Sequence, residues 1–294
     1  MPRLATAQFW RFALAAAVLS LGFALPLCRL CSFAVADDLY SYIPLMPMVS
    51  AYLAWTLKSE LPLESKPARL PALLFFVAGA AALAAYFALG YSGLLAAPEN
   101  ALGLAALAWL LCLAGVGCWC LGGATMRVLV FPFCLLLFMV PLPSFARAAI
   151  ESGLQHASAM VADWIFFVAG TAFWRHDTIF QLPNISLEVA PECSGIHSTW
   201  VLLITSLVAA RMILRRPWRR ALLCLAIIPL ALLRNGFRVF VIGELCIHVG
   251  PGMIDSPIHH HGGPIFFALS LIPMFLLLYV LRRGEQKKPQ AGKA

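Results

Sequence analysis

The sequence predicts an all-α polytopic membrane protein: a helical bundle with about eight transmembrane helices, one interfacial helix and a small hairpin on the outer face. The first observation is composition, because 62% of the 294 residues are hydrophobic, only 12% are charged and the mean hydropathy is +0.88. In soluble domains about a quarter of the residues are charged. The second observation is that apolar runs near the membrane-crossing length of about 20 residues alternate with short polar links. We expect one membrane domain over residues 1–294, with a core at 40–281 and a basic tail at 282–294.

The net charge of +8 comes from basic residues that lie in short clusters between the apolar runs. This distribution is typical of cytoplasmic loops, which carry an excess of Lys and Arg. It does not favour nucleic-acid binding, so no nucleic-acid partner is expected. The nine cysteines include no CxxC pair in a polar context, which predicts neither a disulfide framework nor a zinc site.

Five spans are predicted in the first half of the chain, at about 12–34, 43–57, 71–90, 101–121 and 128–143. The first span follows two arginines and ends in Ala34-Val35-Ala36, which resembles a signal-peptidase site. Its apolar run is longer than the core of a usual signal peptide, so we expect a retained helix.

The next segment is too polar to form a span. Between 144 and 173 a helical pattern is interrupted by Arg147, Glu151, His156 and Asp163, which predicts an interfacial or re-entrant helix. Residues 174–192 then read as extended chain, with a Pro-Asn turn followed by a run that alternates with period two. A small hairpin is therefore expected just before Cys193.

Three further spans are predicted at about 195–213, 221–246 and 264–281. Arginines crowd the link between the first two of these spans, and lysines and arginines follow the third. The positive-inside rule places both clusters in the cytoplasm. The start of the span at 195 and the loop 247–263 are then expected together on the outer face.

Cys193 lies in a polar turn, Pro191-Glu192-Cys193-Ser194-Gly195, directly before an apolar helix. Unpaired N–H groups and the macrodipole at a helix N-terminus favour the thiolate, which is the nucleophilic form of cysteine. The alternative is an inert apolar cysteine. That alternative suits the other eight cysteines, nearly all of which lie inside apolar runs.

Arg234 and Arg238 are four residues apart in a predicted span and therefore share one helical face. Arginine inside a membrane is costly, so the pair indicates a functional site. The alternative is that they snorkel or pair structurally, with Glu244 as a partner. Because Arg238 lies roughly 12 Å and Arg234 roughly 18 Å from the outer end of the span, Arg238 is expected to be closer to the level of Cys193.

The outer loop contains three adjacent histidines, His259, His260 and His261, which suit proton transfer at neutral pH. His197, four residues after Cys193 on the same helical face, is an alternative for that role. No second ligand cluster accompanies the histidines, so no metal and no cofactor are expected.

Three motifs together resemble the exosortase/archaeosortase family of integral-membrane cysteine transpeptidases. They are Cys193-Ser194-Gly195-Ile196 followed by Ser198, then Asn235-Gly236-Phe237-Arg238, then His259 four residues before Gly263 ahead of the last span. The resemblance covers roughly residues 40–281. It implies a Cys-Arg-His site, carried here onto Cys193, Arg238 and His259, with Arg234, Asn235, His197 and His260 as supporting candidates.

The resemblance also implies the reaction and its partners. Cys193 attacks a backbone carbonyl near the C-terminus of an exported protein, and an acceptor resolves the thioester. The substrates carry a short motif such as Pro-Glu-Pro, a transmembrane helix and a basic cluster. The acceptor candidates are a lipid and an exopolysaccharide, and the expected location is the cytoplasmic membrane with the active site facing outward.

Two other classes of protein remain open. A transporter or channel would use Arg234 and Arg238 to bind an anionic solute, which leaves the Cys193 turn and the histidines without a task. A membrane-bound acyltransferase would use Cys193 or an outer histidine. Selective labelling of Cys193 by a thiol probe would favour an enzyme.

Overall fold

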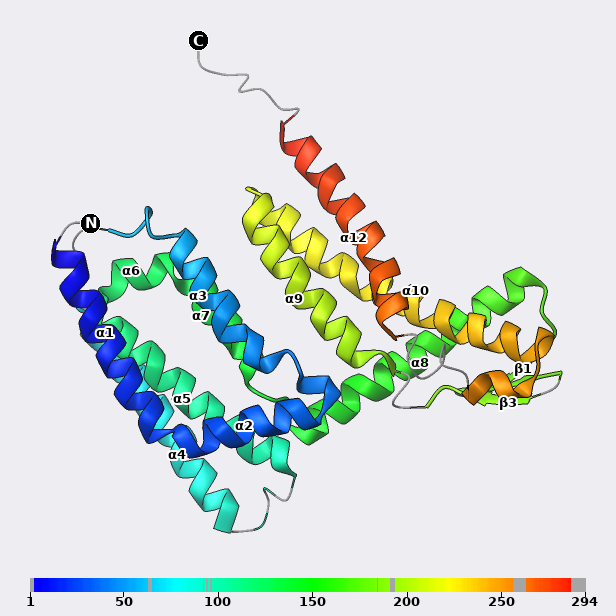
Figure 1. Ribbon diagram of the computed structural model, residues 1–294, viewed down its shortest axis with the longest axis horizontal. Helices are drawn as coiled ribbons and strands as arrows, with labels where there is room; N and C mark the ends of the chain where they lie inside the picture. Colours follow the sequence, from blue (N-terminus) through cyan, green and yellow to red (C-terminus); the bar gives the residue numbers. More distant parts are fainter. Residues whose placement is uncertain are drawn as a thin grey trace. The chain divides into compact units, whose positions relative to one another are not determined.

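The computed structural model describes residues 3–62, 65–91, 93, 95, 97–183, 185–190, 194–255 and 263–286. The chain forms two compact units, Met1–Arg147 and Ala148–Ala294 (Figure 1). Helices dominate both units, and one small β-sheet belongs to the second. The all-α class is therefore confirmed, while the assignment of the chain to one membrane domain stays a prediction.

Five described helices are long and apolar enough to cross a membrane. They are α4 (Arg69–Tyr91), α5 (Pro98–Cys120), α9 (Ile196–Ile213), α10 (Pro217–His248) and α12 (Gly263–Gln286). Each coincides with a predicted span. The chain is thus a multi-pass membrane protein, as its composition predicted.

Two predicted spans are broken rather than straight. The span at 12–34 forms α1 (Arg3–Gly22) and α2 (Ala24–Ala36), whose axes differ by 76°. The span at 128–143 is replaced by α6 (Gly122–Val128), α7 (Val130–Leu135) and the 3₁₀ helix η3 (Leu136–Met139), with a bend of 65°.

A proline accounts for each break. Proline lacks the backbone N–H and its ring collides with the carbonyl of the residue four positions earlier. Pro26 thereby disrupts the helix at Gly22, and Pro132 disrupts it at Val128. The helices are interrupted at the residues that follow Gly22 and Val128, which are Phe23 and Leu129.

The predicted span at 43–57 is not a membrane crossing by length. It contains two short pieces, the 3₁₀ helix η2 (Ile43–Leu45) and α3 (Met46–Thr56). The eleven residues of α3 reach only about 16 Å, against about 30 Å of hydrocarbon. Within the described ranges there are five candidate spans, or up to seven if each bent pair counts as one, so the predicted count of about eight is not confirmed.

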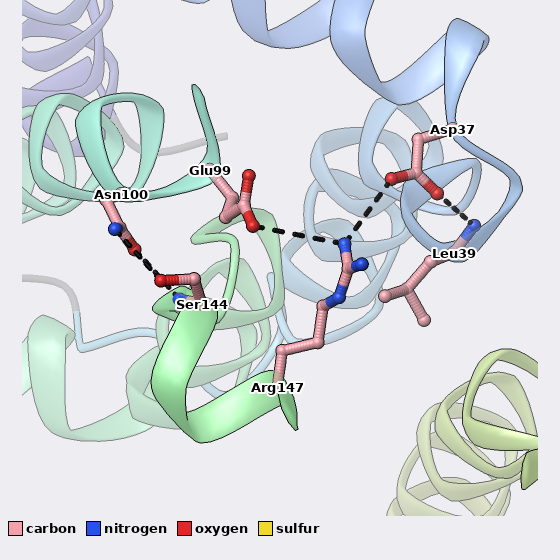
Figure 2. Close-up of polar contacts among 6 residues, drawn as sticks. All are labelled: Asp37, Leu39, Glu99, Asn100, Ser144 and Arg147. Carbon is pink, nitrogen blue, oxygen red and sulfur yellow. Dashed lines mark hydrogen bonds and ion pairs between the residues drawn. The ribbon is translucent and has the colours of Figure 1, made fainter. Parts of the chain in front are cut away.

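In the first unit, α5 is the central helix and is packed against α4 and α1. Arg147 lies between two carboxylates, with Nη1 3.8 Å from Asp37 and 4.0 Å from Glu99 (Figure 2). Beside it, the Asn100 side chain accepts a hydrogen bond from the backbone N–H of Ser144 (2.8 Å) and donates one to its hydroxyl (3.1 Å). These contacts fix the ends of α2 and α5 to the start of the next helix, α8.

That helix, α8 (Ser144–Ala169), begins in the first unit and continues into the second. It is a single helix of 26 residues, and it is not among the candidate spans of the described chain. The predicted helix is therefore present, and its interfacial position stays a prediction.

The predicted hairpin is confirmed, with one additional strand. β1 (Trp174–His176), β2 (Ile179–Leu182) and β3 (Ile185–Glu188) form an antiparallel sheet in the order β1-β2-β3. Polar side chains of α8 meet the strands and their turns: Asp163 lies 3.8 Å from Arg175, and His156 lies 3.2 Å from Asp177. Two of the four polar residues that interrupt the apolar pattern of α8 thus contact the sheet region.

In the second unit, α9, α10 and α12 pack around one core. It contains Leu202 and Leu214 of α9, Leu223 of α10, and Met274 and Leu281 of α12, among others. Because only three residues separate α9 from α10, these two helices run antiparallel. The end of α9, the start of α10 and the end of α12 therefore lie together.

This shared end is basic and is closed by hydrogen bonds. The Glu285 carboxylate accepts hydrogen bonds from the backbone N–H groups of Arg215 (2.9 Å) and Arg216 (2.8 Å). Arg219 Nη1 donates to the carbonyl oxygen of Leu281, and Arg220 Nε to that of Leu214 (2.8 Å). The described arginines of both basic clusters thus occupy one end of these three helices.

The sheet packs against the other half of α10. A second core joins Phe166 of α8, Phe180 and Leu187 of the sheet, and Val239 and Cys246 of α10. Figure 1 shows α10 running past the start of α9 toward the sheet. The start of α9 is therefore at the opposite end of that helix from the basic cluster.

Candidate active site at the start of α9

The N-cap of α9 is Gly195, in the left-handed conformation with φ 71° and ψ 20°. Cys193 precedes this residue by two positions, and residues 191–193 lie outside the described part of the chain. Covalent geometry keeps the Cα atoms of residues 193 and 195 within about 7.6 Å of each other. The surroundings of Gly195 are therefore the described part of the predicted nucleophile site.

The carbonyl oxygen of Gly195 accepts several hydrogen bonds. Within α9 the donors are the Thr199 N–H (3.0 Å), the Thr199 hydroxyl (2.7 Å) and the Ser198 hydroxyl (3.2 Å). From α10, Arg234 Nη2 donates over 3.3 Å and also lies 3.4 Å from the Thr199 hydroxyl. The turn that follows Cys193 is thus tied to α10 by an arginine.

A side chain at position 195 would be both strained and crowded. A Cβ atom there would lie 2.9 Å from Arg234 Nη2 and 3.0 Å from Asn235 Oδ1. The left-handed conformation adds a cost for any residue with a Cβ. Two features therefore favour glycine at this position of the Cys-Ser-Gly motif: the left-handed backbone conformation and the nearby side chains of α10.

Arg234 is buried, with 8% of its surface exposed. Its Nη1 has no hydrogen-bond partner within the described ranges, and no ion pair joins it to a described carboxylate. The Ser194 hydroxyl, beside Gly195, is buried and lacks a partner within the same ranges. Two buried polar groups next to the Cys193 turn are thus available to a ligand or a reacting group.

The Asn-Gly pair that follows Arg234 fits α10 against α8. Asn235 Nδ2 donates to the Ser158 hydroxyl over 3.0 Å, and both residues are buried. A Cβ at Gly236 would lie 2.6 Å from Val161 Cγ1 and 3.0 Å from the backbone nitrogen of Ala162. Glycine therefore permits the contact that orients Asn235 and its neighbour Arg234.

Sequence reasoning missed three residues of this region: Ser158, Thr199 and Gln155. The Gln155 side chain on α8 donates to the carbonyl oxygen of Val189, and Val189 N–H donates to Thr178 (3.0 Å). The segment that leads from β3 toward Cys193 is thereby fixed to α8. Gln155 and Ser158 belong to a helix with several other polar residues, so nothing in the sequence singled them out.

The contacts of Arg234 fix its level along α9, while the level of Cys193 lies outside the described residues. The 18 residues of α9 span about 27 Å, close to the hydrocarbon thickness, whereas α10 is about 48 Å long. Arg234 contacts the first turn of α9, so α10 extends about 21 Å beyond that level. The arginine found beside Gly195 is Arg234, and Arg238 follows one helical turn further along the same face.

Glu244 was considered as a structural partner for Arg234 and Arg238. In the structure one carboxylate oxygen of Glu244 accepts a hydrogen bond from the Thr171 hydroxyl, and the other lies 3.0 Å from His248 Nε2. Glu244 thus joins the end of α10 to the segment that follows α8.

His197 lies in the first turn of α9 and is half-buried. His259, His260 and His261 lie outside the described residues. The first turn of α12 contacts α10 close to the arginines, because Phe266 and Phe237 meet edge to face with centroids 6.4 Å apart. The described start of α12 therefore lies beside Phe237, the residue that precedes Arg238.

The part of the chain that the structure describes contains no group of three or more His, Cys, Asp or Glu side chains that could hold a metal ion. Eight cysteines belong to this part, and all are free thiols. The chemistry of the described site is thus that of a buried arginine, an amide and hydroxyl groups around a helix N-terminus.

The fold and the site together define a multi-pass membrane protein with a polar site where α8, α9 and α10 meet. The chain belongs to the transmembrane exosortase family, whose sequence model matches residues 34–276. Membership places the protein among membrane transpeptidases or proteases that act on sorting signals. No curated protein and no solved structure gives a significant match to the chain.

Proposed function

We propose that this protein is a membrane-embedded cysteine protease and transpeptidase that cleaves C-terminal sorting signals of exported proteins through a Cys193 thioester. The observation that carries the proposal is the contact between Arg234 and Gly195. It joins the Cys193-Ser194-Gly195-Ile196 motif, at a helix N-terminus, to the residue directly before the Asn235-Gly236-Phe237-Arg238 motif. Anions and thiolates are stabilised at such a position.

The proposed reaction starts from the Cys193 thiolate. It attacks the carbonyl carbon of the scissile peptide bond, and the resulting oxyanion is stabilised by the Arg238 guanidinium. When the C–N bond breaks, His259 donates a proton to the leaving amine and the thioester remains. An acceptor then gives its proton to His259 and attacks the thioester, which releases the acylated acceptor and the thiolate.

The position of α12 supports a role for the loop histidines. Gly263 begins α12, and His259 precedes it by four positions, which extended chain spans in at most about 14 Å. The Phe237–Phe266 contact brings the first turn of α12 to the residue before Arg238. The proposed role of His259 rests on this short link between the histidines and the start of α12.

We place the reaction at the outer face of the cytoplasmic membrane. The basic end of α9, α10 and α12 is the expected cytoplasmic end, and the start of α9 is at the opposite end of that helix. A substrate with a transmembrane helix and a basic cluster would align its own bases with this end. Its short motif, of the Pro-Glu-Pro type, would then lie at the level of Cys193, while the acceptor candidates are a lipid and an exopolysaccharide.

Thiol labelling in intact cells tests this orientation. Cysteines introduced by Gln181→Cys, in the sheet, and by Arg215→Cys, at the basic end, are both at exposed positions. An impermeant maleimide should label the first above the wild-type background and should not label the second. The reverse pattern would place the site in the cytoplasm.

Transport of an anionic solute is the alternative function. It would use Arg234 and Arg238 to bind the solute, and it gives no role to the hydrogen bonds between Arg234 and the start of α9. A limiting amount of a thiol-reactive probe separates the two functions. Stoichiometric labelling confined to Cys193 supports the enzyme, and labelling spread over several cysteines supports transport.

The direct test is processing of a co-expressed substrate protein that ends in a sorting motif, an apolar helix and a basic tail. Cys193→Ala should abolish cleavage while the amount of the protein in the membrane stays normal. Cys224→Ala, in α10, is the matched control and should cleave at the wild-type rate. Cleavage by Cys193→Ala near the wild-type level contradicts the proposal.

A further inference from the structure

We infer that Arg234 is a positioning residue of this site: it holds the turn after Cys193 in place and supplies a fixed positive charge beside it. The inference deepens the proposed function and rests on it. It gives Arg234 a task distinct from that of Arg238, to which the family resemblance assigns the role of the site arginine.

The hydrogen bonds of Arg234 carry the positioning part of the inference. Its Nη2 reaches both the Gly195 carbonyl (3.3 Å) and the Thr199 hydroxyl (3.4 Å), and the hydroxyl itself donates to the same carbonyl. One guanidinium thus binds the N-cap residue and the first turn of α9 together. Since Gly195 is two residues from Cys193, movement of this carbonyl moves the nucleophile.

The backbone that carries Arg234 is fixed by the packing of α10 against α8. The neighbouring Asn235 is hydrogen-bonded to Ser158 on α8, and Gly236 allows α10 to approach the backbone of α8. Arg234 is therefore set by helix packing rather than by solvent. Such packing is what a side chain needs in order to fix the position of another residue.

The electrostatic role of Arg234 is inferred from the lack of a described carboxylate beside its guanidinium. A buried guanidinium that lacks an anionic partner costs several kcal/mol, and Arg234 has no described carboxylate as a partner. Its Nη1 and the Ser194 hydroxyl are both buried without a described partner. A Cys193 thiolate, two residues from Gly195, would supply a negative charge for Arg234. The partial positive charge at the N-terminus of α9 would stabilise the same thiolate.

Other titratable groups lie on the elements that meet here. They are Arg238 on α10, His197 on α9, Glu188 on β3, and three pairs: His156 with Asp177, Asp163 with Arg175, and Glu244 with His248. Glu192, next to Cys193 in the sequence, lies outside the described residues. Substitution of Arg234 alone leaves all of these groups in place, so it isolates the contribution of Arg234.

The test measures alkylation of Cys193 by iodoacetamide as a function of pH, counted on the Cys193 peptide by mass spectrometry. Arg234→Gln removes the charge and should raise the pH midpoint of alkylation by about one unit, which slows the reaction about tenfold below the midpoint. Arg234→Lys keeps the charge but not the planar fork. It should leave the midpoint near the wild-type value and lower kcat for substrate processing about tenfold with little change in KM.

Arg216→Gln is the matched control, because it removes the same charge at the basic end of the helices. It should change neither the alkylation profile nor processing. A wild-type profile in Arg234→Gln, with a shifted profile in Arg238→Gln, would overturn the inference. If Arg234→Gln does not fold, Arg234→Lys decides: unchanged kcat and KM in that variant would overturn the positioning role.

Thr199→Val adds an independent variant that alters no charge. It removes the hydroxyl shared by Arg234 and Gly195 and should lower kcat severalfold with the midpoint unchanged. Failure of the inference and failure of the proposed function are distinguishable. A shifted midpoint in Arg234→Gln together with full processing by Cys193→Ala would support the Arg234 contact and overturn the Cys193 nucleophile.

Discussion

Arg234, near the middle of α10, donates a hydrogen bond to the carbonyl oxygen of Gly195, the residue at which α9 begins. The two residues are 39 positions apart in the chain and belong to different motifs. Their contact places a buried guanidinium beside the turn that carries Cys193.

Gly195→Ala should impair both stability and activity. The left-handed conformation costs an alanine about 1–2 kcal/mol, and the new Cβ would displace Arg234 Nη2. We expect a lower melting temperature in detergent and a loss of processing of about tenfold or more. Gly170→Ala has the same left-handed φ with no atom within 4 Å of the Cβ. A comparable loss of activity in that control would show that the collision with Arg234 does not cause the loss in Gly195→Ala.

Gly236→Ala should separate α10 from α8. Its Cβ would meet Val161 and the backbone nitrogen of Ala162, and backbone cannot move as a side chain does. We expect a loss of about 1–3 kcal/mol in the free energy of unfolding, measured by denaturation in detergent micelles. Gly153→Ala, on an open face of α8, should stabilise the protein by about 0.5–1 kcal/mol. Equal effects of the two changes would argue against close packing at Gly236.

Arg238→Lys should lose most of the activity. Stabilisation of an oxyanion by a positioned donor is worth about 3–4 kcal/mol, and lysine does not reproduce the planar fork of arginine. Arg234→Lys should keep more activity because the charge beside the turn remains. The comparison is made on kcat/KM with one substrate, and a larger loss for Arg234→Lys would exchange the roles of the two arginines.

His259→Ala should lower turnover by about 100-fold, because the leaving amine and the acceptor would both lose their proton-transfer group. His260→Ala and His261→Ala should have milder effects. The measurement is the rate of processing with Cys193 intact. A severe effect of His197→Ala, with three harmless loop substitutions, would move the base to the first turn of α9.

The sequence predicted the elements whose signal is local. The spans that became α4, α5, α9, α10 and α12 follow from continuous apolar runs, and the hairpin β2–β3 follows from a turn between alternating residues. The breaks in the chain at Phe23 and Leu129 were not predicted. Prolines occur inside broken and unbroken helices alike, since α10 and α12 continue through Pro229 and Pro273. Packing decides which proline breaks a helix, and a single sequence does not contain that information.

The same limit applies to the site. Helix lengths indicate how deep each arginine lies along α10, but they do not give the offset between neighbouring helices. Because α10 extends about 21 Å past the start of α9, the level of Gly195 is that of Arg234. Ser158 and Gln155 on α8 were missed because their partners, Asn235 and Val189, are distant in sequence.

Intact-mass spectrometry shows whether Cys193 forms a thioester with the substrate. The purified protein is incubated with a peptide that carries the sorting signal, without an acceptor. The account predicts an added mass equal to the acyl fragment, located on the Cys193 peptide, removed by hydroxylamine and absent from Cys193→Ala. Cleavage of the peptide without such an adduct, or with the adduct on another residue, would contradict it.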